Sequence, residues 1–274
     1  MNGARGTLIA LLSLLPAAAL AQKPTLHVDP SLKDCSVIFA PELTQSAFRR
    51  FAREFGSISA FKQMSPPTTL GKGGVALGLD LIRFTVDEAS DAWNDTFAHP
   101  DSAHYLGSDK SFPSLRLRVG VTDAFDLGAY YTRSPGANYG WLGLEGRYGV
   151  LRQSETMPVS LTVRAAYTKT LYVSDMDMHT ATYDVSAGRT FWNRVTAYAG
   201  WGQDLVLARE TSPAVRLKTA LEPVGRRFAG VQVRFWHLAL GVEREAGALT
   251  RTQVQLAMVW WGIRVAAERP PKAA

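Results

Sequence analysis

The side chains best suited to catalysis lie in one short stretch of the sequence. Asp175, Asp177 and His179 follow one another at every second position. Carboxylates beside a histidine can activate water for hydrolysis, because the histidine accepts a proton while the carboxylates hold it in place. The competing interpretation is a solvated loop in which the aspartates stabilise turns. These three residues are the only candidates for catalysis that we single out, and we predict no metal site.

The rest of the chain offers little further chemistry. His99, Asp101 and His104 lie in a second polar stretch that can approach the first in space. The single cysteine, Cys35, can form no intramolecular disulfide and is expected to be a plain thiol. The sequence contains no nucleophile-elbow, zinc-protease or phosphate-loop motif. We therefore expect no cofactor, and enzymatic activity is not the leading hypothesis.

The first residues have the pattern of a secretory signal peptide. Arg5 precedes an apolar stretch over residues 8–15, and Ala19 to Ala21 form a small-x-small cleavage site. This apolar stretch is too short to cross a bilayer as a helix, which takes ~20 residues. We expect an exported protein whose mature chain begins at Gln22, and no helical membrane span follows.

The net charge of the chain is +6, with 30 basic and 24 acidic side chains. In a cell envelope, a positive surface favours partners such as lipopolysaccharide phosphates or acidic sugars over nucleic acid. The alternative is ordinary solvation of charged loops.

An amphipathic helix is predicted from Leu43 to Phe55. Its apolar residues recur at spacings of three and four: Phe48, Phe51, Ala52 and Phe55. Thr44 is the candidate N-cap and Gly56 the candidate C-terminal stop. The apolar face must pack on something. The sequence leaves open whether the helix plugs a barrel, covers its mouth or wall, or binds a membrane surface or a partner.

Alternation of apolar and polar residues governs most of the remaining chain. Within Ser114–Thr122, for example, leucine and valine fill the odd positions while Arg116 and Arg118 lie on the other face. This period of two predicts strands, and most approach the ~9 to 11 residues that a tilted membrane-crossing strand needs. We predict ten strands: Gly74–Val86, Ser114–Thr122, Phe125–Arg133, Asn138–Val150, Val159–Lys169, His179–Thr190, Arg194–Leu207, Arg227–Phe235, His237–Glu243 and Thr252–Val265.

Such strands imply an all-β fold, an antiparallel up-and-down transmembrane barrel of about ten strands (range 8 to 12). Only a closed barrel satisfies the backbone of strands in lipid. Tight turns alternate with three longer loops, Asp87–Pro113, Leu171–Met178 and Ala208–Arg226. Short turns on the periplasmic side and long loops outside would place both termini in the periplasm. The main alternative is a soluble, lipocalin-like ligand-binding barrel of the periplasm, with the apolar face turned inward.

Aromatic residues gather near strand ends, as two membrane-interface girdles would. One group is Tyr130, Tyr131, Tyr139, Trp141 and Tyr172, and the other is Phe191, Trp192, Phe235, Trp236, Trp260 and Trp261.

The stretch Leu115–Val150, LRLRVGVTDAFDLGAYYTRSPGANYGWLGLEGRYGV, resembles uncharacterised outer-membrane β-barrel proteins of Gram-negative bacteria. The resemblance extends from the Leu43 helix to the last strand and implies location in the outer membrane, inserted by the barrel-assembly machinery. It implies no activity. Barrels of this kind commonly end on an aromatic residue, whereas here Val265 holds that position before a tail, 266–274. The expected organisation is a signal peptide (1–21), an N-terminal segment (22–73), a barrel (74–265) and this tail.

If the apolar faces meet lipid, the polar faces line a lumen. The charged residues expected there are Arg116, Arg118, Glu145, Arg147, Arg164, Asp184, Asp204, Arg234 and Glu243. They predict either an ion-pair network that fills the barrel or a narrow, restricted channel with a slight cationic bias, suited to small polar or anionic solutes. The stretch from Asp175 to His179 is also similar in composition to the Asp-Asp and Asp-His pairs of omptin proteases, which are ten-stranded barrels. An outer-membrane hydrolase therefore stays as an alternative.

Overall fold

The computed structural model describes residues 31–87, 89–98, 109–134 and 136–262. The signal peptide, the stretch with His99, Asp101 and His104, and Val265 lie outside the described residues. In the described part of the chain, no helix is both long and apolar enough to cross a membrane.

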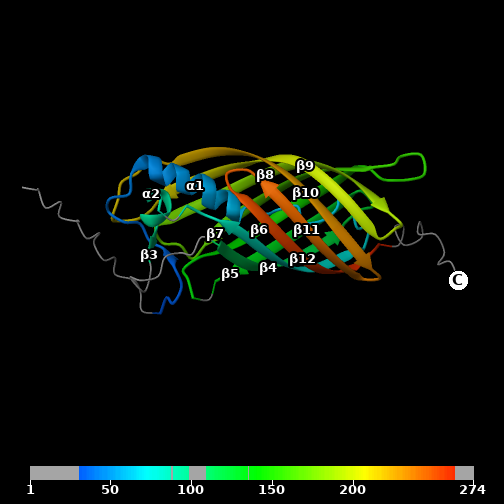
Figure 1. The fold of residues 1–274 in the computed structure, drawn as a ribbon, viewed down its shortest axis with the longest axis horizontal. Coiled ribbons are helices and arrows are strands. Elements are labelled where there is room, and N and C mark those ends of the chain that lie inside the picture. The colour runs from blue at the N-terminus through cyan, green and yellow to red at the C-terminus, as the bar shows by residue number, and fades with distance from the viewer. Residues whose placement is uncertain (1–30, 88, 99–108, 135, 263–274) are drawn as a thin grey trace, which may run out of the picture.

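Ten antiparallel strands close into a barrel (Figure 1). Each strand pairs with its neighbours along the chain, and the last pairs with the first, Leu256 opposite Leu79, so the barrel has no free sheet edge at this seam. The predicted closed barrel of ten strands is confirmed. Its strands are β2 (Val75–Thr85), β4 (Asp109–Gly120), β5 (Phe125–Arg133), β6 (Gly140–Leu151), β7 (Ser160–Leu171), β8 (Met176–Phe191), β9 (Val195–Glu210), β10 (Ala220–Phe235), β11 (Leu238–Ala246) and β12 (Thr250–Trp260).

Three neighbouring strands are longer than the alternation predicts. β8, β9 and β10 have 16 residues each, and their ladders pair Met176 with Glu210 and Ala220 with Ala208. The predicted loops Leu171–Met178 and Ala208–Arg226 are therefore too long. Polar residues near the strand ends obscured the alternation, although cross-strand pairing continues through them.

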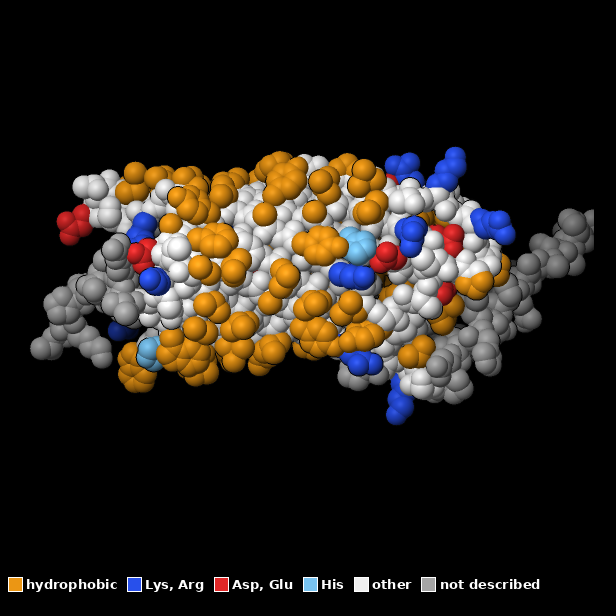
Figure 2. Space-filling model, turned by 180° about the vertical axis from the view of Figure 1, so that it is seen from behind, with side chains coloured by type: hydrophobic (Ala, Val, Ile, Leu, Met, Phe, Trp, Pro, Cys, Tyr) orange, Lys and Arg blue, Asp and Glu red, His pale blue; other side chains and the backbone are white. Residues whose placement is uncertain are grey.

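The wall of the barrel is apolar outside and polar inside. Outward-facing leucines such as Leu79 and Leu144 are about 60% exposed, whereas inward-facing Arg147 is fully buried. Figure 2 shows the apolar side chains across the middle of the barrel and the charged ones gathered toward its ends. This is the construction of a membrane-spanning barrel. The lipocalin-like alternative, with the faces reversed, is wrong.

The two ends of the barrel can be told apart by the chain segments that they carry. At one end, the cap end, lie α1 (Gln45–Ser59), α2 (Asp91–Asn94) and a two-stranded sheet of β1 (Ser36–Val37) with β3 (Phe97–Ala98). At the other, the turn end, lie the tight turns and the end of β12 (Figure 1).

The described N-terminal residues lie at the cap end, where Lys33 and Asp34 donate backbone hydrogen bonds to the Gly136 carbonyl. β12 finishes at the turn end. The expectation that both ends of the chain share one side is wrong for the described residues. The cause is the segment that follows α1, which crosses the whole lumen before β2 begins.

Helix α1 begins as predicted and ends later. The Thr44 hydroxyl accepts a hydrogen bond from the Ala47 amide, which confirms Thr44 as the N-cap. Gly56 does not end the helix, which continues to Ser59. Its role is close packing, because a β-carbon at Gly56 would collide with Val206 of β9.

The two aromatic girdles are only partly as predicted. At the turn end, Trp192 and Trp236 are more than 80% exposed and suit a membrane interface. At the cap end, Tyr131 and Tyr172 face outward, but three predicted girdle residues are buried inside: Tyr130, Tyr139 and Trp141. These three instead pack against the N-terminal segment.

Candidate functional site

The lumen is occupied by the chain itself. Residues 60–73, here called the inner segment, leave α1 at the cap end and reach the turn end, where β2 begins. Their backbone amides bond to the wall along the way: the Phe61 amide to the Thr168 hydroxyl (3.1 Å), the Met64 amide to Glu243 (3.2 Å) and the Leu70 amide to Asp126 (3.0 Å). The inner segment therefore depends on the wall for hydrogen bonds that a strand would obtain from a neighbouring strand.

Arginines of the wall bond to the carbonyl groups of the inner segment. Arg164 donates to the Phe61 carbonyl at 2.8 Å, Arg116 to the Lys62 carbonyl at 2.6 Å, and Arg147 to the Pro66 carbonyl at 3.1 Å. The Arg116 guanidinium also lies 4.5 Å from the centre of the Phe61 ring. Charge-assisted hydrogen bonds of this kind are stronger than neutral ones and hold the backbone in one position.

An ion-pair network surrounds this segment at the level of Lys62. Arg226 of β10 contacts Asp184 at 2.5 Å, Asp204 at 3.2 Å and Glu245 at 3.2 Å. Lys62 contributes the segment's own charge, with its ammonium 2.7 Å from Asp204 and 3.7 Å from Glu245. All five side chains are fully buried. Because each charge has a partner of opposite sign, the network can exist without bulk water.

Positive and negative charges balance in the lumen. In the described part of the chain, seven basic side chains are buried there, one on the inner segment and six on the wall: Lys62, Arg116, Arg118, Arg147, Arg164, Arg226 and Arg251. Seven acidic side chains face them: Asp80, Asp126, Glu145, Asp184, Asp204, Glu243 and Glu245. The slight cationic bias that we expected is therefore wrong.

Most of the residues expected to line the lumen lie inside the barrel. Buried in the interior are Arg116, Arg118, Glu145, Arg147, Arg164, Asp184, Asp204 and Glu243. Arg234 differs, because it lies at the turn end, half-exposed, with its guanidinium 4.8 Å from the Trp261 ring. A residue near the end of a strand can therefore lie at the rim of the barrel rather than in the lumen, even when the apolar-polar alternation assigns it to the inner face.

Sequence reasoning missed several lumen charges. Arg226 lay in a predicted loop, and Glu245 and Arg251 lay just beyond predicted strand ends. Asp80 and Asp126 lay within predicted strands on the polar face and could have been found by the alternation alone. Lys62 had no signal of this kind, because the inner segment has no regular structure.

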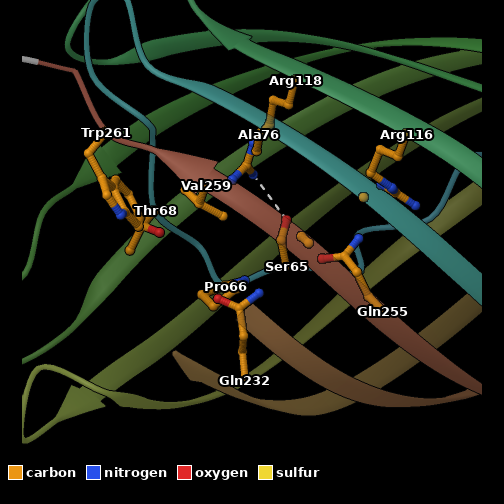
Figure 3. Close-up of a pocket in the computed structure, with 12 residues that line it drawn as sticks. Ser65, Pro66, Thr68, Ala76, Arg116, Arg118, Gln232, Gln255, Val259 and Trp261 are labelled. Carbon is orange, nitrogen blue, oxygen red and sulfur yellow. Dashed lines mark hydrogen bonds between the residues drawn. The ribbon is translucent and has the colours of Figure 1, made fainter. Parts of the chain in front are cut away.

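The space left beside the inner segment is small. A cavity of about 20 Å³ lies toward the turn end, lined by Ser65 and by residues of β2, β4, β10 and β12 (Figure 3). It has room for about one water molecule. Figure 3 shows Arg118 reaching Ser65, whose hydroxyl accepts its hydrogen bond at 3.0 Å. The inner segment thus occupies the lumen between the cap end and the turn end.

The three catalytic candidates are divided between β8 and the residues that precede it. Asp175 is buried and accepts a hydrogen bond from the Phe39 amide at 2.9 Å, so it anchors the cap. Asp177 and His179 project outward from β8, 3.2 Å apart, and His179 also bonds to the Tyr167 hydroxyl. The residues therefore do not share one site, and the expected resemblance to a protease centre is not reproduced in space.

Candidate metal sites are also absent from the described residues, where no group of three or more potential ligands occurs. Cys35, the only cysteine of the sequence, is buried in the cap.

The cap is closed by aromatic packing. Phe51 and Phe55 of α1 stack at 5.0 Å, and Trp93 of α2 lies edge-on at 5.4 Å from Phe51. From the barrel wall, Trp141 contacts Phe55 at 5.6 Å. The Trp93 indole also donates a 2.5 Å hydrogen bond to buried Glu54. Large aromatic rings in such contacts bury much apolar area, so this cluster joins the N-terminal segment firmly to the barrel mouth.

No protein-family model matches the chain, and no curated protein matches it. Solved structures of outer-membrane proteins do. Ail of Yersinia pestis, in complex with the heparin analogue sucrose octasulfate, is 11% identical, with 69% of this chain and 98% of that chain covered and a TM-score of 0.32.

An outer-membrane channel of Pseudomonas putida F1 is 9% identical over 73% of this chain and all of its own, with a TM-score of 0.43. The KdgM porin is 11% identical over 67% of this chain and 99% of its own, with a TM-score of 0.33. Likenesses this low decide nothing about the role of this chain. The apolar outer wall, by contrast, is a property of the chain itself and is what a membrane-spanning β-barrel requires.

Proposed function

We propose that this protein is a self-plugged channel of the bacterial outer membrane, reached by signal-peptide export. In its resting state the inner segment blocks the lumen. When that segment moves, a narrow polar path opens for small solutes. The observation that carries the proposal is the filled lumen, in which the inner segment is held mainly by polar contacts with the wall.

Polar contacts support a movable plug. Water can replace hydrogen bonds and ion pairs once it enters, because the groups released remain solvated. An apolar plug would instead expose hydrophobic surface on leaving. The inner segment has only three large apolar side chains, Phe61, Met64 and Leu70, spaced along it among polar neighbours.

The open path would be narrow and weakly selective. Ten strands enclose a space between the packed interior of eight strands and the open pores of sixteen. Without Lys62, the described strands of the wall present six basic and eight acidic buried side chains, the eighth being Glu222 near the cap end. We therefore expect small polar solutes to pass with a slight preference for cations, rather than the anions first considered.

Conductance in planar bilayers tests this proposal. The wild-type protein should be closed with rare openings, and a variant without residues 22–73 should conduct steadily. Steady conduction by the wild type, or silence of the folded deletion variant, would contradict a self-plugged channel.

A matched pair of variants separates the plug from general damage to the barrel. Arg116→Gln with Arg164→Gln removes two bonds to inner-segment carbonyls and should raise the frequency of openings. Arg189→Gln removes an exposed arginine of the outer wall and should not. Equal opening frequencies for both variants would argue against polar retention of the plug.

A further inference from the structure

Two arginines on the lipid-facing wall of β10 and β11 have no charge partner. Arg227 and Arg244 alternate with the buried network residues Arg226 and Glu245, so their side chains project outward. In the part of the chain that the structure describes, neither arginine forms an ion pair. Arg226 and Glu245, their neighbours on the inner face, pair with each other at 3.2 Å. The unpaired arginines are therefore a feature of the outer face.

The register places these arginines close together. Arg227 is opposite Ala246, and Arg244 is opposite Ala229, so the two are diagonal neighbours on adjacent strands. Diagonal neighbours have Cα atoms about 7–8 Å apart, within reach of long side chains converging on one group. Like charges at this separation repel, and an anion between them would remove the repulsion.

The outward residues around the pair are neutral. Arg227 lies opposite Trp201 of β9, and Arg244 lies opposite Thr252 of β12. Further along the same row, Arg83 of β2 lies opposite Thr252 and adds a third basic side chain. This part of the wall is therefore basic without any outward acidic residue among these neighbours.

A groove opens beside Arg227. Its volume is about 430 Å³, and its lining is Trp201, Gly225, Arg226, Arg227, Ala246 and Gly247. It forms because the β11–β12 hairpin turns back after Ala246, whereas β10 continues to Ala220 without a β11 partner (Figure 1). The groove is open at Gly225, where a β-carbon would meet nothing within 4 Å.

Arg244 lies where the apolar row of β11 ends. Its diagonal neighbour Arg227 lies on β10, where one outward leucine, Leu221, follows toward the cap end. On β11 the outward residues are Leu238, Leu240 and Val242, and Arg244 comes next toward the cap end. On β2 the outward residues are likewise leucines up to Leu81, and the next outward residue is Arg83. Basic side chains at this level meet lipid headgroups rather than acyl chains.

We propose that Arg227 and Arg244 bind the phosphate groups of a phosphorylated glycolipid in the outer leaflet, as lipopolysaccharide presents. Guanidinium groups suit phosphate because they donate two parallel hydrogen bonds. The groove beside Trp201, which is half exposed, accommodates the sugar next to the phosphate. This assignment rests on the proposed outer-membrane location, with the tight turns facing the periplasm and the cap end therefore outside. It does not depend on whether the lumen conducts.

Binding can be measured on the full-length protein in zwitterionic detergent. The probe is bisphosphorylated lipid A, added in steps, and the readout is the temperature at which the heat-modifiable band of the folded barrel is lost. Wild-type protein should gain stability with saturation. The variant Arg227→Gln with Arg244→Gln should bind at least about tenfold more weakly, since each charge-assisted bond lost is worth that much.

Controls address charge and folding. Arg189→Gln removes an exposed arginine of β8 at the turn end, where it lies over Phe191, and should bind lipid A like the wild type. Arg244→Lys keeps the charge but not the paired donors and should fall between wild type and the double variant. If the double variant does not fold, each single glutamine variant should show a smaller weakening.

Two outcomes would overturn the assignment. One is equal lipid A affinity for the wild type and the folded double or single variants. The other is equal stabilisation by phosphatidylglycerol, which would mean that any anionic lipid suffices and that the glycolipid is not selected. Neither outcome bears on conductance, so failure here is distinguishable from failure of the self-plugged channel.

Discussion

The N-terminal segment is held at its two halves by opposite kinds of contact. Around α1, Phe51 and Phe55 pack among the aromatic rings of the cap. From α1 toward the turn end, the inner segment is held by hydrogen bonds from wall arginines to its carbonyl groups and by the ion pair of Lys62 with Asp204. Apolar packing excludes water and is lost only when the contact separates, whereas polar contacts can be exchanged for water one by one.

This difference suggests a division of labour. The aromatic cap anchors the N-terminal segment at the mouth, and the polar inner segment closes the lumen in a form that can be hydrated. Variants of the two halves should therefore have different effects. Substitutions in the cap should release the N-terminal segment from the mouth, whereas substitutions in the lumen should lower the stability of the barrel.

The largest effect is expected when the cap loses its aromatic anchor. Phe51→Ala and Phe55→Ala should each cost about 3–5 kcal/mol of local stability, because both rings are buried. Released from the mouth, the cap should expose the buried Cys35 thiol. The measurement is the rate of Cys35 labelling by a maleimide in the folded barrel. Arg49→Ala, an exposed position on the same helix, is the control and should label slowly.

A labelling rate unchanged in both phenylalanine variants would mean that the cap does not depend on its aromatic cluster. The comparison between the two halves would then be lost.

The next effect concerns the lumen. Arg226→Ala leaves Asp184, Asp204 and Glu245 without a shared partner, and breaking a buried pair in this way costs about 3–5 kcal/mol. We expect a lower urea midpoint for unfolding of the barrel, followed by tryptophan fluorescence, with slow Cys35 labelling retained. Fast labelling in this variant would show that cap and lumen open together rather than separately.

A smaller effect tests the junction between the two halves. Gly56→Ala should destabilise by about 1–3 kcal/mol, because the added methyl group collides with Val206. In a Val206→Ala background the loss should largely disappear, because the two colliding γ-carbons are gone and alanine is the better helix former by about 1 kcal/mol. Urea unfolding of the four proteins measures this. The same loss in both backgrounds would contradict close packing as the role of Gly56.

The smallest effect is expected at the start of α1. Thr44→Ala removes the side-chain acceptor of the Ala47 amide and should cost about 1 kcal/mol. Thr44→Ser keeps the acceptor and should lose little. Cys35 labelling is again the measurement, and a loss as large as that of Phe51→Ala would mean that capping, not packing, holds the cap.

Much of this architecture is readable from the sequence because it depends on local patterns. Alternation alone indicates strands such as Phe125–Arg133, and the spacing of Phe48, Phe51 and Phe55 indicates the helix. Side chains of a strand must alternate between lipid and lumen, so these patterns survive in any barrel that closes.

The remaining features depend on contacts between residues far apart in the chain. The inner segment has no periodicity, and its position is set by wall residues such as Arg164 and Asp126, about 56 to 103 positions away. Asp175 and His179 are close in sequence, but Asp175 precedes β8 and is buried against the cap, whereas His179 lies on the outer face of β8. Local patterns thus predict a barrel with an apolar outside and a charged inside. What fills the barrel could not be predicted from them, because the hydrogen bonds that place the inner segment come from wall residues on several separate strands.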